Sequence, residues 1–215
     1  MIKAIFLDFD GVILESVSVK TDAFLSLFSF VPDHIDEIVQ FHIDNGGISR
    51  FEKFRHIYAN ILHEELTQEL FDRLSNRFSD LVEEKVACAP FVDGAREFIQ
   101  EQSRNRALYI VSATPEEELR RIVDSRGLTQ FFEGICGAPT KKADHIQRII
   151  REKNLSYGEA LFVGDAVNDW DAARVSGIRF IGRIKTGDPN RFLDLAGVEH
   201  IIRNFHDLDI YLMET

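Results

Sequence analysis

The stretch IKAIFLDFDG, residues 2–11, decides the fold class of this 215-residue chain. It is a nearly continuous apolar run of strand length that ends in two acids and a glycine. A run without polar alternation is typical of a strand buried on both faces, and such strands belong to parallel sheets. The opening residues therefore predict the first strand of a parallel α/β sheet.

Runs of the same kind recur further along the chain and are separated by stretches with helical spacing. The expected strands are Ala107–Val111, Ala160–Val163 and Ile178–Ile181, with weaker candidates at Phe131–Cys136 and His200–Ile202. Three helices are expected between these strands. The first has Thr114 as its N-cap and Pro115 in its first turn. The second begins near Thr140, and the third runs from Asn168 to Gly177. This alternation predicts a Rossmann-like parallel sheet with helices on both faces.

Residues 16–89 have a different pattern, with no convincing strand and eight of the 18 phenylalanines. Apolar residues recur there at helical intervals, as in Leu66, Leu70, Leu74 and Phe78. We expect a small all-helical domain of three or four helices, inserted directly after the first strand. The expected domains are therefore 1–15 with 90–215 as the α/β core, and 16–89 as the insertion.

Composition excludes several classes of protein. The formal net charge of −11 argues against nucleic acid as a partner, because phosphate backbones are bound by basic faces. No segment approaches the roughly 18 consecutive apolar residues of a membrane span, so no membrane partner is expected. The two cysteines lie far apart and form no C-x-x-C pair, which favours a reducing, cytoplasmic setting. A monomer or a homodimer is expected.

The strongest chemical signals all follow predicted strands. Asp8 and Asp10 end the first strand, Ser112 follows the second, and Asp165 and Asp169 follow the strand at Ala160–Val163. The carboxyl ends of parallel strands meet at one edge of the sheet, where ligands bind in doubly wound folds. If these acids converge, their mutual repulsion has to be neutralised, and a divalent cation with oxygen ligands such as Mg²⁺ would do so.

These residues, in order, resemble the four motifs of the haloacid dehalogenase superfamily. The resemblance rests on Asp8-Phe9-Asp10-Gly11-Val12, Val111-Ser112-Ala113-Thr114, Lys142, and Val163-Gly164-Asp165 through Asp169. It is closest to the branch of phosphoglycolate phosphatase and β-phosphoglucomutase, whose helical cap is inserted where residues 16–89 stand here. It covers nearly the whole chain and implies a Mg²⁺-dependent phosphatase acting on a small phosphorylated metabolite.

The resemblance also implies a role for each matching residue. Asp8 would be the nucleophile that forms an aspartyl-phosphate, and Asp10 the general acid and base. Mg²⁺ would be held by the Asp8 carboxylate, the Asp10 main-chain carbonyl and the Asp165 carboxylate. Three further residues complete the motifs: Ser112 and the Ala113 N–H would bind the phosphoryl oxygens, and Asp169 would support the metal and the lysine.

Lys142 would neutralise charge beside Asp8, and its neighbour Lys141 is the alternative, since the chain offers two adjacent lysines. We prefer Lys142 because its spacing to the following helix fits the family better. In the cap, Arg50 after Gly46-Gly47 could bind a substrate anion, with Lys53 or Lys20 assisting, or could simply start an exposed basic helix. Three cap histidines are expected to be surface or partly buried polar residues: His42, His56 and His63.

Other functions remain open from the sequence. A phosphomutase would use the same nucleophile but return the phosphoryl group to a second hydroxyl. A non-enzymatic phospho-acceptor module is disfavoured by the insertion and by Asp10, since a second acid poised to activate water would erase a stored phosphoryl signal. An accessory protein without turnover would keep the motifs but not the activity. The presence of Asp10 also favours phosphate esters over carbon–halogen bonds, because an alkoxide leaving group needs a proton.

Overall fold

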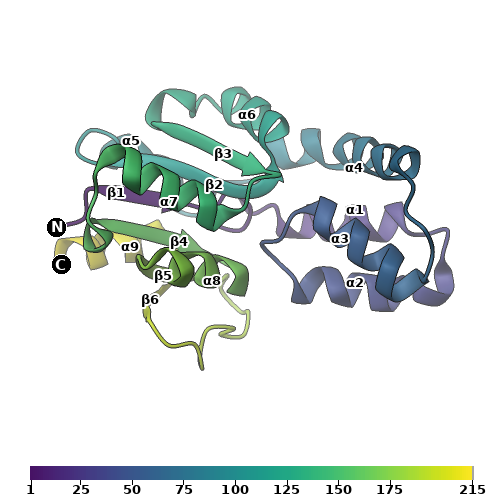
Figure 1. The fold of residues 1–215 in the computed structure, drawn as a ribbon. Helices are drawn as coiled ribbons and strands as arrows, with labels where there is room; N and C mark the ends of the chain where they lie inside the picture. The colour runs from purple at the N-terminus through teal and green to yellow at the C-terminus, as the bar shows by residue number, and fades with distance from the viewer. Residues whose placement is uncertain (215) are drawn as a thin grey trace.

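The computed structural model describes residues 1–214, which form a parallel six-stranded sheet with an inserted group of helices (Figure 1). The strand order is β3-β2-β1-β4-β5-β6, and every neighbouring pair is parallel. The strands are β1 (Ala4–Leu7), β2 (Ala107–Pro115), β3 (Gly134–Ala138), β4 (Ala160–Gly164), β5 (Arg179–Arg183) and β6 (Val198–Ile202). The prediction of a Rossmann-like α/β core is confirmed, including both weaker strand candidates.

Strand β1 lies at the centre of the sheet and is buried on both faces, as its continuous apolar run predicts. Ile5 and Leu7 pack into one hydrophobic cluster, and Ala4 and Phe6 pack into the other. This alternation follows from the period of two along a strand. Neither face of β1 is left for solvent, so both layers of helices are needed to cover the sheet.

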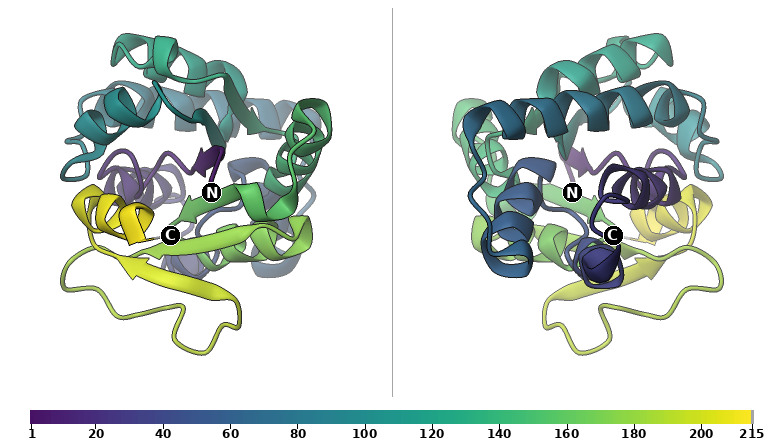
Figure 2. Two further views of the ribbon diagram at one scale, coloured as in Figure 1. Left: turned by 90° about the vertical axis from the view of Figure 1, so that its left-hand side faces the viewer. Right: turned by 90° about the vertical axis from the view of Figure 1, so that its right-hand side faces the viewer.

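The helices of the core cover both faces (Figure 2). They are α5 (Ala95–Gln102), α6 (Glu116–Ser125), α7 (Lys142–Lys153), α8 (Val167–Ser176) and α9 (Phe205–Glu214), with short 3₁₀ turns η3 (Thr129–Phe131) and η4 (Tyr157–Glu159). Residues of α7 and α8 join the cluster around Phe6, while α5, α6 and α9 join the cluster around Leu7. Helix α8 ends at Gly177 in the left-handed conformation, as predicted.

One predicted helix start is wrong. Thr114 is not an N-cap, and Pro115 is not in the first turn, because β2 continues to Pro115 and pairs it with Ala138 of β3. Helix α6 therefore begins at Glu116. The Thr114 hydroxyl is engaged elsewhere, since it donates a hydrogen bond to the side chain of Asp10.

The insertion after β1 is entirely helical, as expected. It contains α1 (Val17–Leu27), η1 (Pro32–His34), α2 (Ile35–Asp44), α3 (Arg50–His56), the π-helical turn η2 (Ile57–Leu62) and α4 (Gln68–Ala87). Its core is a cluster of aromatic rings, in which Phe24, Phe54 and Phe78 contact one another. In Figure 1 this helical cap lies at one end of the sheet, and both chain termini lie at the opposite end.

Two adjacent segments connect the cap to the core. The N–H of Glu15 donates to the carbonyl of Pro90, and the N–H of Val92 donates to the carbonyl of Ile13. The outgoing and returning chains are therefore tied together where they cross between the two parts. Among residues 1–214, no helix has both the length and the apolar character required to cross a membrane.

Candidate active site

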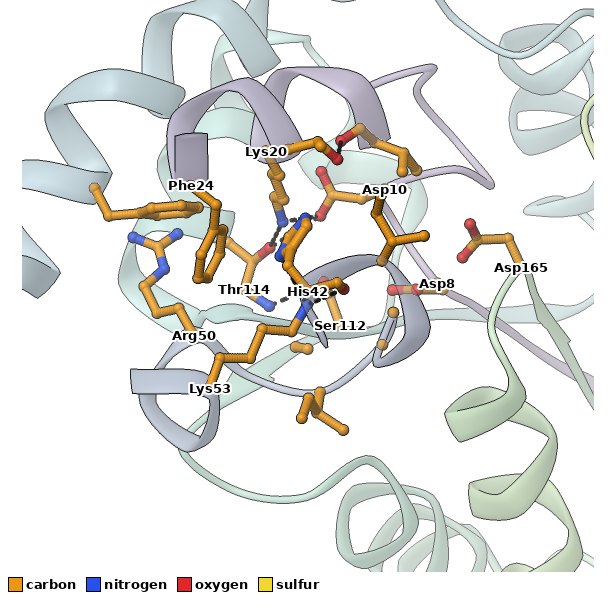
Figure 3. Close-up of a pocket in the computed structure, with 18 of the residues that line it drawn as sticks. Asp8, Asp10, Lys20, Phe24, His42, Arg50, Lys53, Ser112, Thr114 and Asp165 are labelled. Atoms are coloured by element: carbon orange, nitrogen blue, oxygen red, sulfur yellow. Dashed lines mark hydrogen bonds and ion pairs between the residues drawn. The ribbon is translucent and has the colours of Figure 1, made fainter. Parts of the chain in front are cut away.

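The structure brings the predicted site residues together at the carboxyl edge of the sheet (Figure 3). Strands β1, β2 and β4 are direct neighbours, so the residues that follow them share one edge. Asp8 and Asp10 follow β1, Ser112 lies in the last part of β2, and Asp165 follows β4. The topology thus places side chains from distant parts of the chain around a single crevice.

Three carboxylates form a tight cluster in this crevice. Asp8, Asp165 and Asp169 each offer one oxygen, and these oxygens all lie within 4.8 Å of one another. Asp169 is wholly buried, and its Oδ2 accepts a hydrogen bond of 3.0 Å from the N–H of Ala166. An all-carboxylate set of this size is the donor chemistry that Mg²⁺ prefers.

Lys142 contacts two of these three carboxylates. Its Nζ is 2.9 Å from Oδ2 of Asp8 and 2.5 Å from Oδ1 of Asp169, and the residue is buried. Lys141 is the N-cap of α7 and is exposed. Because α7 begins at Lys142, only the second of the two adjacent lysines is directed into the site.

A single lysine does not neutralise the cluster. Burial, aided by the charges of Asp169 and Asp10, raises the pKa of Asp8 to about 7, although Lys142 opposes the shift. Burial and the neighbouring charges of Asp169 and Asp8 raise the pKa of Asp165 well above its ordinary value. The protein alone therefore disfavours the charged forms of these carboxyls, and a bound divalent cation would favour them.

Asp10 has a separate environment from the other acids. Its carboxylate accepts hydrogen bonds from Ser16 at 2.6 Å and from Thr114 at 3.0 Å, and it pairs with Lys20 of α1. Burial on its own would raise the pKa of Asp10, but Lys20 and these hydrogen bonds lower it overall. The two aspartates of the first motif thus have opposite pKa shifts, which is the pattern of groups with different roles.

Ser112 and Ala113 lie where β2 leaves its regular pairing. The register between β2 and β3 shifts between Val111 and Pro115, so the backbone here is released from the ladder. The N–H of Thr114 donates to Oγ of Ser112 at 3.2 Å, and the hydroxyl hydrogen of Ser112 remains able to donate to a ligand. Both residues line the crevice and can present donors to an anion.

Two glycines allow the acids to approach so closely. Gly11 has φ +77°, and a Cβ there would lie 2.3 Å from Oδ2 of Asp165. A Cβ on Gly164 would lie 2.2 Å from Cβ of Asp169. Any larger residue at either position would displace a carboxylate of the cluster, because real Cβ atoms do not tolerate such distances.

A cavity of about 260 Å³ extends from these residues up to the cap. Its core side includes Asp8, Asp10 and Ser112, and its cap side includes the side chains of α1, α2 and α3 (Figure 3). The volume lies just below the range of about 300–1,000 Å³ that is typical of small-molecule sites. The cavity therefore suits a compact ligand whose one end faces the carboxylates and whose other end faces the cap.

The structure alters the expectation for Arg50. Its guanidinium is buried and forms a bidentate pair with Glu118 of α6, with N–O distances of 2.5 and 3.0 Å. Ser79 of α4 binds the same carboxylate at 2.7 Å. Arg50 borders the cavity, but its charge is already neutralised by the core, so it is neither an unpaired anion-binding group nor part of an exposed basic helix.

Two residues that the sequence analysis named lie in surroundings that it did not predict. His42 is buried on the cavity wall, whereas we expected a surface or partly buried residue; His56 and His63 are exposed. The signal available in the sequence was the spacing of four residues between His42 and Ile38, which are both buried on α2. Thr114, read as a helix cap, instead contacts Asp10 and Lys20.

Comparisons with known proteins agree with this geometry. A model of the haloacid dehalogenase-like hydrolase family matches residues 2–177. The chain belongs to the haloacid dehalogenase-like hydrolases. Phosphoglycolate phosphatase 1 of Pseudomonas aeruginosa is 25% identical over 186 residues, which are 82% of this chain and 67% of that protein. The family and this relative identify the chain as a phosphatase.

Solved structures of low identity share the fold of this haloacid dehalogenase-like phosphatase. A predicted phosphatase from Clostridium acetobutylicum superimposes with a TM-score of 0.78 at 16% identity, and the match covers 100% of both chains. CbbY from Rhodobacter sphaeroides, in complex with phosphate, superimposes with a TM-score of 0.74 at 18% identity, over 97% of this chain and 96% of that one. Because these matches extend over the whole chain, they include the helical cap as well as the sheet.

Proposed function

We propose that this phosphatase requires Mg²⁺ and hydrolyses a small phosphate monoester through a phosphoryl group carried on Asp8. The observation that supports this most directly is the convergence of Asp8 with Lys142, Asp165 and Asp169 at the carboxyl edge of the sheet. A partly exposed crevice with a buried nucleophile, a lysine and donor groups for an anion is suited to phosphoryl transfer.

Asp8 and Asp165 would hold the metal through their carboxylates, with the main-chain carbonyl of Asp10 as a further ligand and Asp169 in support. The cluster fits the ion because its oxygens lie within 4.8 Å of one another and carry more negative charge than Lys142 balances. When bound, Mg²⁺ would keep Asp8 ionised and draw electron density from a phosphoryl oxygen.

Asp8 would act as the nucleophile in the first step. One of its carboxylate oxygens forms a bond to phosphorus while the bond from phosphorus to the ester oxygen breaks. The Ser112 hydroxyl and the Ala113 N–H would bind the phosphoryl oxygens, and Lys142 would stabilise the negative charge as it shifts. In this step Asp10 would act in its protonated form, which the negative charge of the adjacent substrate phosphate favours, and it would give its proton to the departing alkoxide, which leaves as an alcohol.

Water completes the reaction in the second step. The ionised Asp10 takes a proton from the water as its oxygen attacks phosphorus, and the bond between phosphorus and Asp8 breaks to release phosphate. The lowered pKa of Asp10 in the free protein keeps its carboxylate ionised, and therefore able to accept this proton. Closure of the cap over the cavity would exclude other water from the reacting group.

The proposed division of labour assigns the chemistry to residues 1–15 and 90–215 and the choice of substrate to the cap, residues 16–89. Because the relative from Pseudomonas aeruginosa is named a phosphoglycolate phosphatase, 2-phosphoglycolate belongs in the first panel of substrates. A reducing compartment, the cytoplasm, is proposed from the cysteines, since Cys88 and Cys136 are both free thiols in the described chain.

Phosphate release from a panel of small phosphate esters tests this function. Wild-type protein should release phosphate with Mg²⁺ and lose this activity in a chelator, and Asp8→Asn should lose at least about 10³-fold in rate. Asp33→Asn is the matched control, because Asp33 is an exposed acid of the cap. Retention of a tenth of the rate by Asp8→Asn would rule out the nucleophile, and transfer of labelled phosphate to a second hydroxyl would identify a mutase instead.

A further inference from the structure

Four cationic side chains line the cavity, and three of them have a carboxylate partner. Lys20 pairs with Asp10, Arg50 pairs with Glu118, and Nη2 of Arg191 is 3.6 Å from Asp188. Lys53 is the exception among the cations of the cavity within residues 1–214. Its side chain enters from α3 and reaches toward His42 instead of an acid (Figure 3).

Lys53 is deeply buried, with 4% of its surface exposed. Its Nζ lies 3.0 Å from Nδ1 of His42 and 3.0 Å from the His42 carbonyl oxygen, and 5.5 Å from the centre of the Phe24 ring. These are neutral partners. A buried ammonium with only neutral partners is costly, because its lost hydration is not replaced by an opposite charge.

The titration of Lys53 agrees with this geometry. Burial, together with the charge of Lys20, lowers the pKa of Lys53 to about 7. An anion placed beside the ammonium would raise that pKa again and compensate for the missing carboxylate. Lys53 therefore lacks a negative counter-charge within residues 1–214, and a negatively charged ligand would supply it.

His42 offers a second donor at the same place. A charged Lys53 can only donate, so Nδ1 of His42 accepts and the ring hydrogen is on Nε2. Burial and the charges of Lys53 and Lys20 lower the pKa of His42 to about 3, so the ring stays neutral. The ring packs against Phe24 with centroids 4.1 Å apart, which fixes its orientation.

We propose that Lys53 and His42 form a subsite in the cap that binds a second anionic group of the substrate, a carboxylate or a second phosphate. This rests on the proposed function, since the first phosphate is bound at Asp8 and Ser112 across the same cavity. The small cavity limits the distance between the two anionic groups to that of a compact metabolite. Arg50 does not take this role, because Glu118 already holds its guanidinium.

Three esters with the same two-carbon skeleton test the subsite. Two of them, 2-phosphoglycolate and ethylene glycol bisphosphate, carry a second anionic group and are called the charged esters here. The third, 2-hydroxyethyl phosphate, carries only the shared phosphate. Wild-type protein should prefer at least one of the two charged esters by about 10- to 100-fold in kcat/KM, as expected for a hydrogen bond between charged groups. The ester that is preferred shows whether the subsite binds a carboxylate or a phosphate.

Lys53→Met should remove this preference, so that the three esters give similar values of kcat/KM. Lys85→Met is the matched control, since Lys85 is an exposed lysine of α4 and the substitution removes the same charge. The control should keep the preference for the charged ester. A structural role alone would lower the rates on all three esters together.

Two results would overturn the subsite. One is a wild-type protein that shows no preference for either charged ester, a comparison that does not depend on any variant folding. The other is a preference that persists in Lys53→Met. If no ester releases phosphate, the proposed function fails separately, and calorimetric binding of the same three compounds to wild type and Lys53→Met still decides the subsite by the same criterion.

Discussion

Two buried lysines face the same crevice from opposite sides, and their surroundings differ in one respect. Lys142 of the core lies within 2.9 Å of two carboxylates, whose charges raise its pKa above the ordinary value although burial opposes them. Lys53 of the cap has hydrogen bonds only to His42 among residues 1–214, and burial lowers its pKa to about 7. The core thus provides negative charges beside Lys142, whereas the cap, residues 16–89, provides none beside Lys53.

In our proposal, this difference separates a fixed catalytic group, Lys142, from a group that binds part of the substrate, Lys53. A lysine between two carboxylates is charged at every physiological pH and holds those carboxylates in place. A lysine without a counter-charge has free energy to gain from an incoming anion, and that gain can be used for selection. Each of the following predictions changes one side of the comparison.

Replacing the core lysine should have the largest effect. Lys142→Met removes the cation between Asp8 and Asp169 and should lower kcat by about 10²–10³-fold, as loss of a charge-stabilising group does. Lys141→Met should leave kcat within a few-fold of wild type, because Lys141 is exposed. Steady-state kinetics on one ester measures both variants, and equal losses would contradict the assignment of Lys142.

Breaking the buried pair between cap and core should reduce stability more than selectivity. Arg50→Met leaves the buried carboxylate of Glu118 with only Ser79, and should lower the free energy of unfolding by about 3–5 kcal/mol. The preference for charged esters should survive, in contrast to Lys53→Met.

The matched control is another ion pair between cap and core, which joins α4 to α6. Arg121→Met breaks the exposed pair with Glu83 and should lower the free energy of unfolding by at most about 1 kcal/mol. Urea titration monitored by circular dichroism compares the two variants. A smaller loss in Arg50→Met than in Arg121→Met would show that the buried pair does not anchor the cap.

The smallest expected effect is a pH dependence of KM that arises from Lys53 of the cap. Below pH 7 Lys53 is charged in the free protein, and above pH 7 an anion can bind it only with uptake of a proton. The ratio of KM for a charged ester to KM for 2-hydroxyethyl phosphate should therefore rise toward tenfold per pH unit above about 7.

The groups facing Lys53 do not produce this rise themselves. His42 of α2 has a pKa of about 3 and stays neutral throughout, and Lys20 of α1 is paired with Asp10. The ratio of the two KM values also cancels the ionisation of the shared phosphate. A flat ratio between pH 6 and pH 9 in wild type, or the same rise in Lys53→Met, would contradict the prediction.

The core and its site could be predicted from short stretches of sequence. The apolar run that ends at Asp8 predicts a central strand, and the parallel arrangement of the strands brings Asp165 to the same edge. The choice of Lys142 over Lys141 follows in the structure from the first residue of α7. Such inferences succeed because each signal is local and a parallel sheet has only one carboxyl edge.

The helical cap could be predicted as a whole, but its interactions with the core could not. The sequence by itself determined the α/β order, the helical insertion and the acids at the strand ends, because periodicity and strand polarity are properties of neighbouring residues. Only the tertiary structure decided that Arg50 meets Glu118, 68 positions away, and that Lys53 meets His42 without an acid. Whether a buried charge is compensated depends on which distant side chains pack around it, and no local pattern specifies them.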